Sequence, residues 1–114
     1  MNTAFDLSNY REMDVNQPFS LIKARRTIMW SWGARNWTNI NNKGLLFRVS
    51  GFKHKGKVLI ALNGSDLYNV ILLNTRDRVI DTIEDLYFDD LVNAIDNRIE
   101  KTENYEKDVR EATY

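Results

Sequence analysis

The sequence predicts an α+β domain in which an antiparallel sheet of four or five strands packs against an N-terminal and a C-terminal helix. Three observations carry this prediction. An amphipathic helical pattern precedes residue 33, short apolar runs separated by turn signals fill the middle of the chain, and a second helical pattern follows residue 84. A chain of 114 residues has room for one hydrophobic core, which favours a single domain.

The N-terminal part of the chain predicts a loosely docked arm over residues 1–15, followed by a single α+β domain over residues 16–104. Pro18 suits the first turn of a helix, because its missing N–H has no partner there. Apolar residues at helical spacing then form one stripe, composed of Leu21, Ala24, Ile28 and Trp32. Gly33 suits a left-handed C-cap, so we expect one helix over residues 18–32.

Strand signals fill the region that follows. "RNWTNI" (35–40) is a possible short strand, "LLFRVS" (45–50) alternates apolar and polar residues, and "KVLIAL" (57–62) is almost continuously apolar. Asn63-Gly64 is a hairpin signal, and residues 67–73 and 78–83 complete the predicted sheet.

The C-terminal part predicts a second helix from about Asp85 to about residue 103, with residues 105–114 as a frayed or helical tail. Its apolar stripe completes the expected core. The predicted core residues are Ile22, Ile28, Trp32, Phe47, Val49, Val58, Ile60, Leu62, Val70, Leu72, Leu91, Ile95 and Ile99.

The chemistry of the side chains argues against an enzyme. The chain has no cysteine, which excludes disulfides, thiol catalysis and thiolate zinc sites. Its one histidine, His54, lies between two lysines on an expected hairpin tip, where we predict a solvent-facing side chain without catalytic partners. We therefore expect no catalytic residue, no metal and no cofactor.

The N-terminus shows no signal peptide, and no stretch approaches the ~20 apolar residues that a membrane span needs. We expect a protein of the host-cell cytoplasm with no membrane partner, and a homodimer is one of the oligomeric states that the sequence allows.

Charge is distributed unevenly along a chain whose net charge is zero. Residues 17–57 contain nine Lys and Arg and no acid, whereas residues 82–114 contain ten acids and four bases. The two segments either face each other, or one of them forms a surface for a charged partner.

The stretch "WSWGARNW" (30–37) concentrates all three tryptophans. Trp32 lies on the apolar stripe and is expected in the core. Trp30 lies off the stripe and is either exposed or covered by the N-terminal arm. Trp37 lies near Arg35, and an arginine beside an exposed aromatic ring can stack on bases or anchor a protein interface.

These features give two candidate partner sites. The first is a basic, aromatic-containing surface for nucleic acid or a nucleic-acid-handling complex, built on the expected 45–50/57–62 hairpin. It consists of Arg35, Trp37, Arg48, Phe52, Lys53, Lys55 and Lys57. The alternative is an acidic surface at the start of the second helix, formed by Asp85, Asp89 and Asp90, with which an inhibitor of a host defence system would bind a basic host protein.

The blocks "GARNW" (33–37), "GLLFRVSG" (44–51), "KVLIALNGSDLYNV" (57–70) and "LYFDDLVNAI" (86–95) resemble, in order and spacing, a family of small proteins. Bacteriophages and mobile elements of gut bacteria encode this family. Here Arg35 and Trp37 replace the family's usual Lys and Phe, and the tail "KTENY" departs from its usual ending. The resemblance implies an accessory protein of a phage or mobile element and supplies no catalytic residue.

Overall fold

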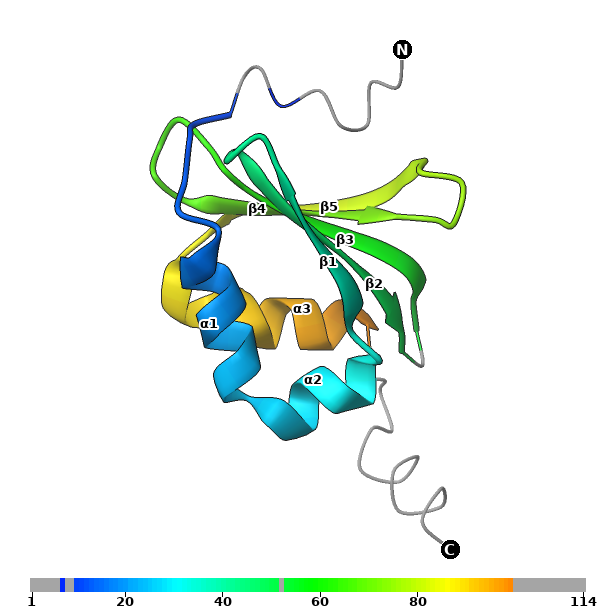
Figure 1. Ribbon diagram of the computed structural model, residues 1–114. Helices are drawn as coiled ribbons and strands as arrows, with labels where there is room; N and C mark the ends of the chain where they lie inside the picture. The colour runs from blue at the N-terminus through cyan, green and yellow to red at the C-terminus, as the bar shows by residue number, and fades with distance from the viewer. Residues whose placement is uncertain (1–6, 8–9, 52, 100–114) are drawn as a thin grey trace, which may run out of the picture.

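The computed structural model describes residues 7, 10–51 and 53–99 and confirms the predicted α+β fold (Figure 1). Five antiparallel strands form one sheet in which each strand pairs with its neighbour in the sequence, in the order β1-β2-β3-β4-β5. The strands are β1 (Arg35–Ile40), β2 (Gly44–Ser50), β3 (Lys55–Leu62), β4 (Tyr68–Leu73) and β5 (Val79–Leu86).

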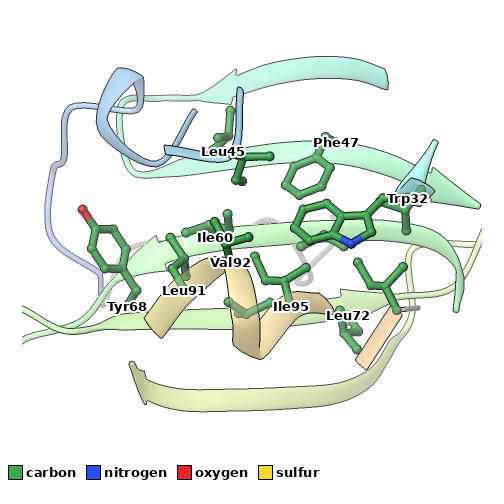
Figure 2. Close-up of a cluster of buried hydrophobic side chains, with 14 of the residues drawn as sticks. Trp32, Leu45, Phe47, Ile60, Tyr68, Leu72, Leu91, Val92 and Ile95 are labelled. Atoms are coloured by element: carbon green, nitrogen blue, oxygen red, sulfur yellow. The ribbon is translucent and has the colours of Figure 1, made fainter. Parts of the chain in front are cut away.

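The helices lie on one face of this sheet (Figure 1). They are α1 (Asn16–Ala24), α2 (Arg26–Trp32), a short 3₁₀ turn η2 (Phe88–Asp90) and α3 (Leu91–Ile99). The main core fills the space between them and the sheet, and Figure 2 shows Trp32 beside Phe47, with side chains of α3 opposite the strands. All the predicted core residues are buried except Ile28 and Leu62, which are half-buried against the same core.

The single helix predicted over residues 18–32 is wrong, because the chain breaks at Arg25. Arg25 has φ −100° and ψ 64°, and its N–H donates to the carbonyl of Ile22. Ile22 before the break and Trp32 after it are both fully buried. Gly33 ends α2 in the predicted left-handed conformation, with φ 63° and ψ 34°.

The second helix begins at Leu91 rather than at Asp85, because β5 continues to Leu86. The pairing of Leu86 with Tyr68 holds this part of the chain in the sheet. Asp85 lies at an irregular point of the ladder with φ 58°, so it is not part of a helical first turn. None of the described helices combines the length and apolar character that crossing a membrane requires.

A second apolar cluster lies on the opposite face of the sheet, where Leu59, Ala61, Ile71 and Leu73 pack with Leu7. Leu7 is buried, and a Cβ added to Gly44 would lie only 2.6 Å from Leu7 Cδ1. The Arg11 N–H donates to the Leu62 carbonyl over 2.9 Å. The described part of the arm is therefore packed more closely than the sequence predicted.

Candidate functional site

Three cations lie directly opposite one another on the helix-free face of the sheet. Arg35 of β1 is paired with Arg48 of β2, and Arg48 is paired with Lys57 of β3. The alternation of β2 explains the position of Arg48: Phe47 and Val49 point into the main core, so Arg48 points to the other face. We call Arg35, Arg48 and Lys57 the cationic row.

The positive charges of the three residues in the cationic row differ in whether an acidic side chain neutralises them. Arg35 Nη1 donates to the Gly33 carbonyl over 2.9 Å and to Ser50 Oγ over 3.3 Å, and neither acceptor carries a charge. Lys57 Nζ forms a half-buried ion pair with Asp77. Arg48 is half-buried, and its buried Nε has no hydrogen-bond partner among the described residues. Only one of the three charges is thus paired within the described structure.

The surroundings of the cationic row are also basic. In this meander the start of β1, the β2–β3 turn and the β4–β5 turn lie at the same end of the sheet. Lys55, the first residue of β3, is exposed there. Arg76 and Arg78 flank Asp77 in the β4–β5 turn and are exposed. The sequence reasoning missed these two arginines, although the pairing of β4 with β3 brings their turn beside Lys57.

Lys53, predicted for the same surface, has a structural role elsewhere. Its N–H donates to the Ile99 carbonyl and its Nζ donates to the Asn97 carbonyl, both over 2.7 Å. A lysine at a helix C-terminus satisfies free carbonyls and complements the helix dipole. The β2–β3 connection therefore folds back against α3 instead of projecting from the core as predicted. Phe52 lies outside the described residues.

The prediction of a solvent-facing His54 is wrong. His54 is buried, its Nε2 lies 3.2 Å from the Lys57 carbonyl, and its own carbonyl accepts the Gly51 N–H. These contacts hold His54 within the β2–β3 connection instead of at an exposed tip.

Trp37 also differs from its prediction, because its side chain packs mainly inward. Its ring stacks on Phe47 with centroids 4.3 Å apart and meets the edge of Phe19 at 4.9 Å. It therefore lies on the helix side of the sheet, opposite the cationic row. Trp32 is buried as predicted, and its indole N–H donates to Asp96 Oδ1 over 2.9 Å. Trp30 is the exposed member of the three, with 74% of its surface accessible.

The three residues of the predicted acidic surface lie in two different elements, β5 and η2. Asp85 belongs to β5, where its carboxylate accepts a hydrogen bond from Asn63 and its N–H donates to Asn69. Asp89 and Asp90 are exposed in η2, directly before α3. Beside them, Tyr87 is 66% exposed and Phe88 is 39% exposed. The structure thus adds two aromatic side chains to this surface and assigns Asp85 to a hydrogen-bonded strand end.

Within residues 7, 10–51 and 53–99, no group of three or more His, Asp or Glu side chains lies close enough together to hold a metal ion. No protein-family model, curated protein or solved structure matches this chain.

Proposed function

We propose that this protein is a non-catalytic binding protein that holds the phosphate backbone of a nucleic acid on the cationic row and the adjacent Lys55. The observation that carries the proposal is the pairing of three cations across three neighbouring strands on the helix-free face of the sheet. The proposed ligand is a polyanion, since the charges are arranged along a line.

The row has an energetic cost in the free protein. Directly opposite residues on neighbouring strands have Cβ atoms about 5 Å apart, and like charges at that separation destabilise a sheet. Asp77 compensates Lys57, while Arg35 and Arg48 have no acidic partner within the described residues. An anionic ligand would remove the repulsion by giving both guanidinium groups a counter-charge.

Guanidinium groups suit this ligand better than ammonium groups alone. Arg35 and Arg48 each present a planar set of N–H donors that can bind one phosphate through two hydrogen bonds. Lys55 adds an exposed point charge at the end of the row. In keeping with the family resemblance of the sequence, we propose that the protein acts as an accessory factor of a phage or mobile element in the host-cell cytoplasm.

The test is titration of fluorescein-labelled oligonucleotides, followed by fluorescence anisotropy at several salt concentrations. Four phosphate contacts give a log–log salt slope of about −3 to −4. Arg48→Gln is expected to weaken binding and reduce the slope by about 1. Lys43→Gln removes the same charge from the β1–β2 turn at the other end of the sheet and is expected to leave both unchanged.

Circular dichroism and thermal melts would verify that both variants are folded. Equal binding by wild type, Arg48→Gln and Lys43→Gln would contradict the proposal, and so would binding that does not depend on salt.

A second candidate function is inhibition of a basic host protein, and the exposed Tyr87 and Phe88 beside Asp89 and Asp90 favour it. Aromatic side chains are frequent energetic centres of protein interfaces, and the two acids would select a basic partner. Tyr87→Ala would then abolish capture of a host protein, while Arg48→Gln would have no effect on it. Weakened oligonucleotide binding by Arg48→Gln, with unchanged oligonucleotide binding by Tyr87→Ala, would instead support the nucleic-acid proposal.

A further inference from the structure

Trp30 is the most exposed large apolar side chain among the described residues. It lies in the last turn of α2, two residues before the fully buried Trp32. A tryptophan normally buries much of its large surface, so one that is three-quarters exposed has a ring face available for a ligand.

The residues around Trp30 are basic. Arg26 precedes it by one helical turn and lies on the same side of α2. Arg25 and Arg26 also line a shallow, open depression at the break between α1 and α2, together with Ala24, Thr27 and Ile28. Neither arginine takes part in any of the ion pairs of the described structure, and residues 16–32 contain no acid.

Two hydrogen bonds link the backbone at Trp30 to Arg35, the first member of the cationic row. The Gly33 N–H donates to the Trp30 carbonyl over 3.0 Å, and Arg35 Nη1 donates to the Gly33 carbonyl over 2.9 Å. The Arg35 guanidinium therefore lies at the C-terminal end of α2, within about one helical turn of Trp30 along the chain. Figure 1 shows α2 ending beside the start of β1, where the row begins.

From this arrangement we propose that Trp30 stacks on an unpaired base while Arg35, the member of the cationic row that reaches the end of α2, binds the neighbouring phosphate, so that the ligand is single-stranded nucleic acid. This inference rests on the proposed function. A base in a duplex has both faces covered by its neighbours, whereas a single strand offers base faces to an exposed indole. The row alone would not distinguish the two forms, because both present phosphates.

The test compares a labelled 15-nucleotide oligo-dT with a labelled 15-base-pair duplex, using wild type, Trp30→Ala, Trp30→Phe and Tyr87→Ala. Trp30→Ala is expected to weaken oligo-dT binding about 5- to 150-fold, the equivalent of losing one stack of about 1–3 kcal/mol, and to leave duplex binding unchanged. Trp30→Phe retains an aromatic ring and is expected to recover most of the loss. Tyr87→Ala, which removes an exposed ring from the acidic surface, is expected to bind oligo-dT as wild type does.

Two results would overturn the inference and leave the proposed function intact. One is oligo-dT binding by Trp30→Ala at wild-type strength, and the other is an equal loss for both ligands. Failure of the proposed function looks different, because wild-type protein would then bind neither ligand in a salt-dependent manner. Trp30-dependent binding to vesicles containing phosphatidylserine, without binding to oligo-dT, would also contradict both and assign the indole to a lipid surface.

Discussion

Leu46 and Arg48 lie two residues apart on the same face of β2, yet they belong to surfaces of opposite character. Leu46 packs with the apolar cluster that Leu7 of the N-terminal arm covers. Arg48 belongs to the cationic row at the other end of the strand. β3 shows the same change, with Leu59 and Ala61 in the apolar half and Lys55 and Lys57 in the basic half.

The helix-free face of the sheet thus has two parts with different roles, an apolar half that stabilises the fold and a basic half that is proposed to bind a ligand. The apolar half is closed by the chain's own arm, and its residues stabilise the fold in the usual way by leaving water. The basic half contributes unfavourable charge contacts, and among the described residues only Lys57 has an acidic partner within it. Stability and binding are thus expected to respond differently to substitution in the two halves.

The largest expected effect comes from the apolar half. Leu59 is fully buried beneath the arm, and Leu59→Ala is expected to lower the free energy of unfolding by about 2–5 kcal/mol, because it leaves a cavity. Urea denaturation followed by circular dichroism measures this loss. Ile95→Ala, in the main core, is the control on the helix side and is expected to cost a similar amount. A loss below about 1 kcal/mol for Leu59→Ala alone would show that the arm-covered half contributes little.

The basic half is expected to respond in the opposite direction. Arg48→Met keeps much of the side-chain volume but removes a charge between two cations and a buried Nε without a partner. We expect the free energy of unfolding to rise by about 1 kcal/mol while oligonucleotide binding weakens. Arg98→Met, which removes an exposed arginine paired with Asp81, is the control and should change stability by less than about 0.5 kcal/mol. A clear loss of stability in Arg48→Met would indicate that the row is a structural feature.

A smaller effect is expected at the one compensated member of the row. Lys57→Met, Asp77→Asn and the double variant form a cycle that isolates the coupling between the two side chains. Because the ion pair is only half-buried, the coupling free energy is expected to be about 1 kcal/mol or less. Denaturation at low and at high salt would measure it, and salt should reduce it. A coupling near zero would mean that Asp77 does not compensate the row.

The smallest effect concerns alkaline pH. Burial raises the pKa of the Tyr68 hydroxyl above its ordinary value near 10, with a further contribution from the Asp14 carboxylate. The folded state holds this proton more tightly than the unfolded state, so its contribution to stability is complete below about pH 10 and is lost as pH rises through the folded-state pKa. Wild type should therefore lose slightly more stability than Tyr68→Phe between about pH 9 and 11. Parallel losses in the two proteins would contradict this.

Local patterns in the sequence were enough to determine the classes of its elements and most of its core. Apolar spacing identified both helical regions, and alternation assigned Phe47 and Val49 to the core and Arg48 to the opposite face. The conformational freedom of glycine predicted the left-handed cap at Gly33. Each of these inferences depends on residues within a few positions of one another.

Tertiary structure decided the break at Arg25, the start of α3 at Leu91 and the burial of His54. It also decided the composition of the candidate site. Lys53 does not lie on the predicted surface because it binds a carbonyl of α3. Trp37 does not lie there because its ring packs against Phe19 of α1. The cationic row exists only through the register that pairs Arg35 with Arg48 and Arg48 with Lys57. Periodicity assigns a residue to a face, but strand register and loop docking depend on contacts between distant residues, which a local pattern does not contain.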